Sequence, residues 1–285
     1  MILITGATGN VGAELARNLS GRGVPFRAMV RSPEAAKRID ALAGAELVAG
    51  DFDDPASLAR ALSGVERAFL LTNSSERAEA QQRAFVAAAQ RAGVRHLVKL
   101  SQLAAAPNSP VRFLRYHAAV EDAVRASGMA YTFLRPNLFM QGLLGFRTTI
   151  AAEGKFYAAA ADARISAIDV RDIAAAAAAA LSEDGHEGHT YDLTGPEALT
   201  HADMAERLSA ALGRHVEFVD VPPDIMRQAL VSAGLPSWQA DGLIEDYAHY
   251  RRGEASAITS GVQNATGRPP RSFADFARDY AAAFS

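Results

Sequence analysis

The sequence contains no cysteine among its 285 residues, and this absence removes three kinds of chemistry. Disulfide bonds, zinc–thiolate sites and cysteine nucleophiles are all excluded. Long apolar runs are also missing, because no stretch approaches the ~18 uncharged residues that a membrane-spanning helix needs. The alanine run at 174–180 is short and has charged residues on both sides. We therefore expect a closely packed helix there.

A large excess of positive or negative charge is missing as well. The formal net charge is −3 and no basic cluster stands out, so we expect binding neither to nucleic acid nor to a membrane. The hydrophobic share of 49% suits a globular chain with a sizeable core. The chain opens on a strand-like segment with no leader-like region before it, which favours a cytoplasmic protein. Nothing in the sequence decides between a monomer and a homodimer.

Three familiar site patterns are absent or incomplete. The sequence has no Gly-x-Ser-x-Gly elbow, so a serine hydrolase of that type is not expected. The opening glycines lack the Gly-Lys-Ser/Thr ending of a phosphate-loop NTPase. His186 and His189 are metal-like residues without further ligands nearby, so we expect no metal site.

What the sequence does contain is a strand, a glycine turn and a helix within its first twenty residues. The apolar run Ile2–Ile4 is followed by three glycines, each three positions from the next, and then by a helix-like stretch. Such glycines permit a tight turn, a close approach to a pyrophosphate and close packing of helix on strand. The helix N-terminus also favours an anion. The expected dinucleotide contacts are Gly6, Thr8, Gly9, Asn10, Val11 and Gly12.

Strand-like and helix-like segments alternate through the first half of the chain, which predicts an α/β fold with a doubly wound, mostly parallel sheet of Rossmann type. The expected strands are 2–4, 26–30, 46–49, 67–71, 96–100 and 131–134. The expected helices between them are 33–42, 57–62, 77–92 and 115–127.

The rhythm changes after residue 136. We predict a dinucleotide-binding core over 1–136, joined by 165–195, with short strands at 167–170 and 190–193. Residues 137–164 and 196–285 are predicted to form a smaller substrate-binding or lid region. Within it we expect a helix over 200–212 opened by Thr200 and Asp203, a strand over 216–221 and a loop over 253–270. Apolar side chains that could line a substrate pocket are Phe139, Met140, Phe146, Phe156 and Tyr157.

The end of the second expected strand bears on the choice of dinucleotide. Arg31 stands there, 19 positions after Gly12, where an acidic residue would select the free ribose 2′-hydroxyl. A guanidinium can instead bind a 2′-phosphate through two parallel hydrogen bonds, and Lys37 could add charge. We therefore favour NADP(H) over NAD(H). The alternative is an exposed turn with solvated cations.

Other cofactor contacts are expected where strands end, because ligands of such sheets lie beyond the carboxyl ends of the strands. Asp51 could accept a hydrogen bond from the adenine amino group, with Phe52 beside the ring. Alternatively, Asp51 only forms a turn. The remaining expected contacts are Leu71, Thr72, Asn73, Pro136 and Asn137.

With these residues in place, the chain resembles the NmrA-like group of atypical short-chain dehydrogenase/reductases. The matching segments are Gly6–Gly12, Val30-Arg31, Gly50-Asp51 and Leu134-Arg-Pro-Asn137. His117-x-x-x-Glu121 is similar to a pattern of the branch that holds quinone reductases and triphenylmethane-dye reductases. The resemblance implies NADP(H) binding, a small C-terminal substrate region, and either reductase or redox-sensing regulatory function.

Typical short-chain reductases combine a serine, a tyrosine and a lysine four residues after the tyrosine, whose charge favours the tyrosinate. Ser101 and Tyr116 stand at the first two positions, but Val120 stands at the third. We therefore expect an incomplete proton relay. Quinones and cationic triarylmethane dyes would tolerate this, because they need no strong protein acid. The catalytic candidates are Tyr116, His117 and Ser101, and His117 could pair with Glu121 one helical turn away.

Three functions remain open from the sequence. The first is an NADPH-dependent reductase that transfers hydride to an apolar aromatic or quinone-like small molecule. The second is a non-catalytic, NADP-binding, redox-sensing regulator of a partner protein. The third is isomerase or epimerase chemistry on the same scaffold.

Overall fold

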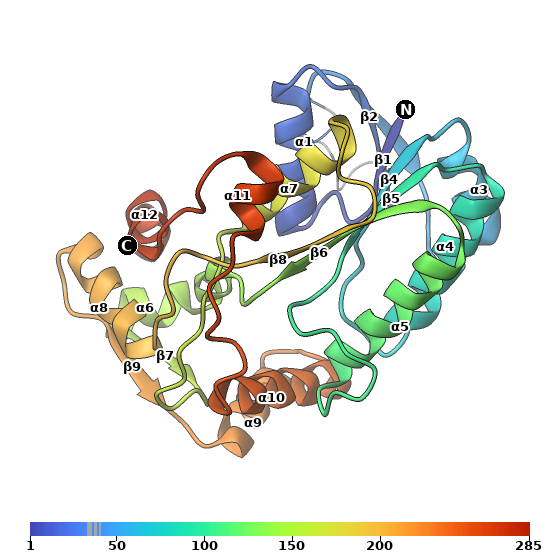
Figure 1. Cartoon of the computed structure of the whole chain (residues 1–285). Coiled ribbons are helices and arrows are strands. Elements are labelled where there is room, and N and C mark those ends of the chain that lie inside the picture. Colours follow the sequence, from blue (N-terminus) through green and yellow to red (C-terminus); the bar gives the residue numbers. More distant parts are fainter. Residues whose placement is uncertain (33–35, 37–38, 40) are drawn as a thin grey trace.

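A seven-stranded parallel sheet forms the centre of the structure, a computed structural model that describes residues 1–32, 36, 39 and 41–285 (Figure 1). The strand order is β3-β2-β1-β4-β5-β6-β8, and every neighbouring pair runs parallel. The predicted Rossmann-type fold is therefore confirmed. The strands are β1 (Ile2–Ile4), β2 (Phe26–Val30), β3 (Ala45–Ala49), β4 (Arg67–Leu70), β5 (His96–Leu100), β6 (Ala130–Pro136) and β8 (His189–Leu193).

Helices cover both faces of this sheet, because its strands are apolar on both sides (Figure 1). Ile2 and Ile4 of β1 point to one core, whereas Leu3 points to the other. The first face carries α1 (Asn10–Gly21), α7 (Val170–Ser182) and α11 (Gly261–Thr266). The second face carries α3 (Pro55–Leu62), α4 (Ala78–Arg91) and α5 (Arg112–Ala126).

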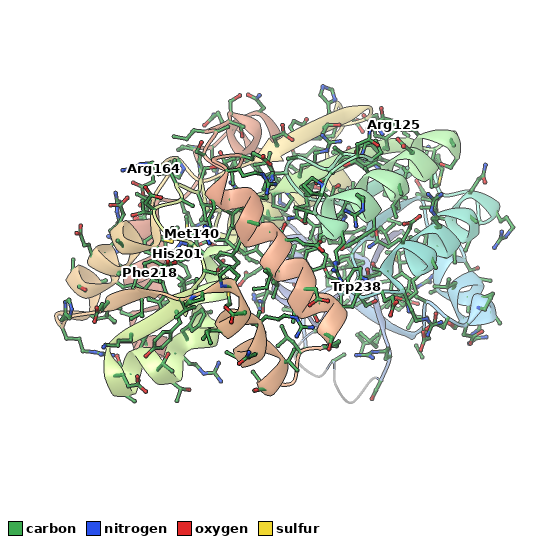
Figure 2. The ribbon with its side chains drawn as sticks, turned by 90° about the horizontal axis from the view of Figure 1, so that it is seen from below. Arg125, Met140, Arg164, His201, Phe218 and Trp238 are labelled. Carbon is green, nitrogen blue, oxygen red and sulfur yellow. The ribbon has the colours of Figure 1, made fainter. Side chains whose placement is uncertain are left out.

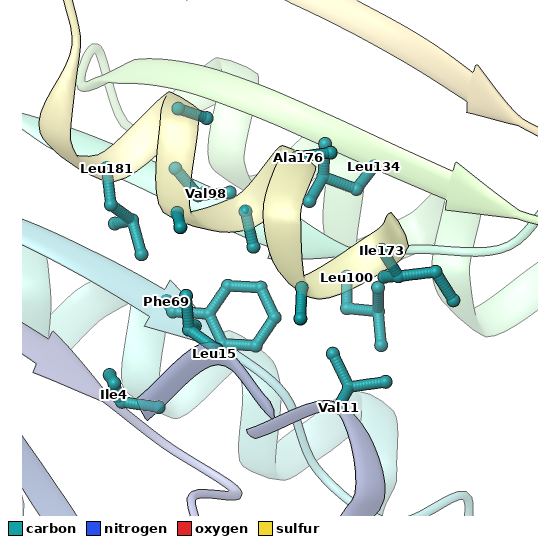
Figure 3. Close-up of a cluster of buried hydrophobic side chains, with 14 of the residues drawn as sticks. Ile4, Val11, Leu15, Phe69, Val98, Leu100, Leu134, Ile173, Ala176 and Leu181 are labelled. Atoms are coloured by element: carbon teal, nitrogen blue, oxygen red, sulfur yellow. The ribbon is translucent and has the colours of Figure 1, made fainter. Parts of the chain in front are cut away.

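The alanine run forms most of α7, as expected. Its small side chains let α7 lie close against α1 and the sheet, and Ala177 is fully buried there. Figure 3 shows Ile173, Ala176 and Leu181 of α7 near Leu15 of α1 and Phe69 of β4. The strand order reverses between β1 and β4, so a crevice for a ligand is expected beyond the carboxyl ends of these two strands.

A smaller region packs at one end of the sheet around a second, two-stranded parallel sheet of β7 (Lys155–Ala158) and β9 (Glu217–Asp220). Its core includes Phe156, Phe273 and Phe276. The other elements of this part of the chain are η2 (Met140–Phe146), α6 (Arg147–Glu153), α8 (His201–Leu212), α9 (Pro223–Ser232), α10 (Ser237–Arg251), α12 (Phe273–Asp279) and η3 (Ala281–Phe284).

Ionic contacts tie the two parts together. Asp169 accepts a hydrogen bond from the Arg171 backbone and so caps α7, while Arg171 also pairs with Asp279 of α12 at 2.7 Å. Asp172 pairs with Arg271. The predicted capping box of Thr200 and Asp203 is likewise present at the start of α8.

Several boundaries differ from the sequence expectations. The predicted strand at 167–170 is only an isolated bridge between Phe139 and Ile168, because α7 already begins at Val170. The predicted loop at 253–270 contains α11, whose Val262 and Ala265 complete the main core. Strand β7 was not expected. The predicted helix at 33–42 lies largely outside the described residues, as does Lys37. Every helix among the described residues is too short or too polar to span a bilayer.

The packing of α7 on α1 gives a matched pair of substitutions. Ala177 is fully buried in the main core, whereas Ala175 lines an open groove between α1 and α7. Ala177→Leu should lower the free energy of unfolding by about 1–3 kcal/mol, since the added methylenes have no space. Ala175→Leu should change it by less than about 0.5 kcal/mol. Urea denaturation of both variants measures the difference, and equal effects would contradict the close packing.

Candidate functional site

The glycine turn joins β1 to α1 through contacts that leave no room for side chains. Gly6 has a φ of +62°, and a Cβ there would lie 2.8 Å from the Leu71 side chain. A Cβ on Gly12 would lie 2.1 Å from the Gly6 carbonyl oxygen. The Thr5 hydroxyl donates to the Phe69 carbonyl at 2.9 Å and accepts from the Leu71 backbone at 2.8 Å, which fixes the turn against the end of β4.

The first turn of α1 is left open for an anion. Gly9 is the N-cap residue and has no side chain to satisfy the helix N–H groups, and the first turn contains no acidic residue. Thr8, Gly9 and Asn10 are exposed, whereas Val11 and Gly12 are buried, so Val11 offers a ligand only its backbone. Free N–H groups and the helix dipole suit a pyrophosphate. These residues therefore fit a dinucleotide.

Arg31 and Asp51 both follow strands at this edge of the sheet and are exposed. The Asp51 carboxylate accepts a hydrogen bond from the Asp53 backbone at 2.9 Å, so one of its oxygens forms the turn of the alternative interpretation. Phe52 is half-buried, with its ring 5.8 Å from that of Phe85.

The expected cofactor contacts after β4 and β6 differ in their burial and in whether their side chains already have hydrogen-bond partners in the protein. Leu71 is half-buried against the glycine turn and Asn73 is exposed, while the Thr72 hydroxyl accepts from Gln82 at 2.8 Å. Pro136 is buried at the end of β6. The Asn137 side chain donates to Ser166 at 2.9 Å and to the Ala255 carbonyl at 2.8 Å, and it accepts from the Leu138 backbone. Asn137 thus ties the end of β6 to later segments.

A buried polar cluster lies between β5, β6 and α5. Glu121 is fully buried and receives two hydrogen bonds from Arg135, at 2.9 and 2.6 Å, and one from the Ser101 hydroxyl at 2.6 Å. Burial alone would raise the pKa of Glu121, but these hydrogen bonds outweigh it and hold that pKa below its ordinary value. The Ser101 hydroxyl is therefore engaged inside the protein.

The expected pairing of His117 with Glu121 is wrong. His117 Nδ1 lies 2.8 Å from Lys99 Nζ, and Lys99 also donates to the Leu100 carbonyl at 3.0 Å. Burial lowers the pKa of Lys99 to about 7 and that of His117 well below its ordinary value. The sequence reasoning missed Lys99 because it considered only a lysine on α5. A charged residue within an otherwise apolar strand was the available signal.

Tyr116 lies beside this pair, with its ring centroid 4.2 Å from that of His117 and its hydroxyl 3.1 Å from the Ser74 hydroxyl. Burial raises the pKa of Tyr116 to about 12. No tyrosinate is favoured near neutral pH. Val120, at the position of the usual lysine, is fully buried in the apolar core of this face.

Helix α10 packs across the start of α5. Arg112 donates to Glu245 at 2.6 Å and lies 5.4 Å from the Trp238 ring centroid. Gly242 allows this contact, because a Cβ there would lie 2.3 Å from the Phe113 ring. Figure 2 shows Trp238 at one end of this helix, with Met140, His201 and Phe218 grouped in the smaller region.

Asp246 of the same helix is a buried carboxyl group that the sequence reasoning missed. It is 5% exposed, and Gln102, the residue after Ser101, donates to its two oxygens at 3.0 and 3.2 Å. Burial raises the pKa of Asp246 to about 7. The apolar residues of α10 do not gather on one face, so periodicity gave no sign of which side is buried.

The expected pocket-lining residues are largely core. Phe156 is fully buried and Met140 packs in the same core. Phe139 packs against the main core, while Phe146 and Tyr157 are half-buried. The rings of Phe113 and Trp238 lie beside Tyr116 instead, with centroids at 6.3 and 6.4 Å from its own.

Comparison with known proteins shows the family of this chain. The NmrA-like family profile matches residues 1–259. The chain belongs to the NmrA-like family. This confirms the resemblance inferred from the glycine turn and the segments after it.

Three similar proteins cover the full length of the chain or nearly so. An NAD(P)H azoreductase of Xenophilus azovorans is 40% identical over 284 residues, which are 100% of this chain and 99% of the relative. The Escherichia coli NADPH-dependent quinone oxidoreductase complexed with NADPH has a TM-score of 0.87 and 32% identity, covering 98% of this chain and 99% of that one. The Citrobacter sp. triphenylmethane reductase complexed with NADP(H) has a TM-score of 0.86 and 28% identity, covering 99% of this chain and 100% of that one.

The contact of Gly12 with Gly6 predicts a large effect of a single methyl group. Gly12→Ala should lower the free energy of unfolding by about 3 kcal/mol and abolish NADPH binding, because the turn must open. Gly21→Ala, in the same helix, meets nothing within 4 Å and should raise stability by up to about 1 kcal/mol. Thermal unfolding and calorimetric NADPH titration test both variants. Unchanged NADPH binding by Gly12→Ala would contradict the assigned cradle.

Proposed function

We propose that this chain is an NADPH-dependent reductase that delivers hydride to an apolar aromatic or quinone-like acceptor. The observation that carries the proposal is the open first turn of α1 behind Gly6, Gly9 and Gly12, at the switch point of the sheet. The similar proteins support the reaction class, since all three are named as reductases or oxidoreductases.

The cofactor is held by backbone at one end and by charge at the other. The N–H groups at the start of α1 bind the pyrophosphate, and Arg31 binds the ribose 2′-phosphate. NADPH supplies the hydride when it is bound. Thr72, Asn73 and Pro136 border the middle and the nicotinamide end of the cofactor, at the carboxyl ends of β4 and β6.

The acceptor lies beside Tyr116, where Phe113 and Trp238 supply apolar surface. The Tyr116 hydroxyl shares a hydrogen bond with Ser74 and remains protonated near neutral pH. It therefore orients the acceptor by donating a hydrogen bond, without giving up its proton. The chain works without the usual Ser-Tyr-Lys relay, since Val120 replaces the lysine and Lys99 is engaged with His117 in the interior. Positioning and exclusion of water then make up most of the catalysis.

An acceptor panel tests the reaction class. Purified protein with NADPH should reduce quinones and cationic triarylmethane dyes, and loss of NADPH absorbance measures the rate. Turnover above the uncatalysed background supports the reductase. Tight NADPH binding by calorimetry with no turnover across the panel would instead favour the non-catalytic regulator.

Arg31 should determine the preference for the phosphorylated coenzyme. Arg31→Ala removes charge-assisted hydrogen bonds to the 2′-phosphate, so the Kd for NADPH should rise by about 10-fold to 100-fold while the Kd for NADH changes little. Arg91→Ala, at an exposed arginine at the end of α4, is the control and should leave both affinities unchanged. Calorimetric titration with each coenzyme measures the four constants. A parallel loss of both affinities in Arg31→Ala would contradict this role.

A further inference from the structure

The reductase proposed above lacks an obvious proton donor, and α10 carries a carboxyl group that none of the roles assigned so far uses. Asp246 lies where α10 meets the residue after β5, and its only hydrogen-bond partner among the described residues is the Gln102 side-chain amide. We propose that Asp246 is the general acid of the reduction: its carboxyl group donates a proton to the acceptor atom that becomes negatively charged as hydride is added.

The place of Asp246 supports this role. Gln102 directly follows Ser101 at the carboxyl end of β5, where the sheet faces its ligand. Asp246 is near enough to Tyr116 for its charge to raise the pKa of that phenol. One turn earlier, Gly242 packs on the ring of Phe113, which keeps this part of α10 against the start of α5. Asp246 therefore belongs to the same corner of the fold as the proposed acceptor.

The surroundings of Asp246 keep a proton on it. Its titratable neighbours are Tyr116 from α5, and Glu245, Tyr247 and Tyr250 from α10 itself. None of these supplies a positive charge, and no described cation pairs with Asp246. Burial raises the pKa of Asp246 to about 7, and the charge of Glu245 acts in the same direction. When protonated, the carboxyl carries a hydroxyl that can donate one hydrogen bond.

The step balances with a quinone as acceptor. Hydride from bound NADPH adds to one carbonyl oxygen of the quinone, and the electron pair moves through the ring to the opposite oxygen. That oxygen forms a bond to the Asp246 proton as the carboxyl O–H bond breaks, which gives hydroquinone and a carboxylate. NADPH is oxidised to NADP⁺, the quinone is reduced by two electrons, and water returns the proton to Asp246. A triarylmethane cation takes hydride at carbon and needs no proton.

The two acceptor classes therefore separate this role from a structural one. At about pH 6 the carboxyl and the amide of Asp246→Asn are both uncharged, so a cationic dye meets no change in charge. Asp246→Asn should lower kcat for a quinone by about 100-fold, within the range of general acids, and leave kcat for a triarylmethane dye within about 2-fold. Glu206→Gln, at an exposed residue of α8, is the control and should change neither rate.

Two further measurements do not depend on comparing the quinone rate with the dye rate. The wild-type kcat for the quinone should fall as pH rises through about 7, whereas Asp246→Asn should show no such fall. Asp246→Glu should recover part of the quinone rate. A folded variant that reduces the dye normally also shows that loss of quinone reduction does not come from misfolding.

A readout without substrate is the pH dependence of stability. The folded state keeps the Asp246 proton up to about pH 7, while the unfolded state releases it near pH 4. Unfolding therefore releases a proton between these values, so this group lowers stability progressively over that range and by a constant amount above it. The gain in unfolding free energy of Asp246→Asn over wild type should widen from about pH 4 to about pH 7 and then stay constant.

The outcomes distinguish this role from the underlying reductase. Equal losses of quinone and dye reduction in Asp246→Asn would overturn the general-acid role and indicate a structural one. An unchanged quinone rate would also overturn the general-acid role. If the gain in unfolding free energy of Asp246→Asn over wild type does not vary with pH, the carboxyl of Asp246 is not protonated in the folded state. A wild-type protein that reduces neither acceptor would overturn the reductase itself, and the acid with it.

Discussion

The close approach of α1 to the end of β1 is the contact on which the rest of the structure depends. The backbone of Gly12 lies against the Gly6 carbonyl, where one additional carbon would overlap it. This contact sets the direction of α1, and with it the direction of the open N–H groups in its first turn. It also sets the distance at which α7 packs on α1, which only the small side chains of the alanine run allow. The contact of Gly12 with Gly6 thus shapes both the open first turn of α1 and the packing of the main core.

Sequence alone predicted the elements whose signals are local. The glycines, the strand alternation and the capping box of Thr200 and Asp203 all depend on near neighbours, and they were confirmed. Failures came where distant segments decide. The stretch at 253–270 has the composition of a loop, yet α11 forms there, with Val262 and Ala265 packed into the main core. Lys99 stood out as a charge within an apolar strand, but its partner on α5 could not be read from its own segment. The partner of Asp246, the residue after β5, is equally distant in sequence.

The buried polar cluster decides which candidate groups remain free. Glu121 is satisfied by Arg135, Arg125 and Ser101, and His117 contacts Lys99, so both residues of the His117-x-x-x-Glu121 pattern are engaged inside the protein. Losing one partner of such a buried group costs more than the net gain of forming the pair, which favours a fixed arrangement. Tyr116 is different because the Ser74 hydroxyl is the single hydrogen-bond partner of its hydroxyl among the described residues. We therefore propose Tyr116, and not His117 or Ser101, as the residue that contacts the acceptor.

Two neighbouring carboxylates on α10 show how environment assigns roles. Glu245 is held by Arg112, and these hydrogen bonds outweigh its burial and lower its pKa. Asp246, the next residue, has the Gln102 amide as its one hydrogen-bond partner within the described part of the chain, so burial raises its pKa. Pairs of titratable groups whose pKa values are pushed apart are typical of acid–base sites. The clamp of Arg112 on Glu245 fixes α10, and the fixed helix brings Asp246 over the carboxyl edge of the sheet. The ion pair of Arg112 with Glu245 therefore also helps to position Asp246, the proposed acid.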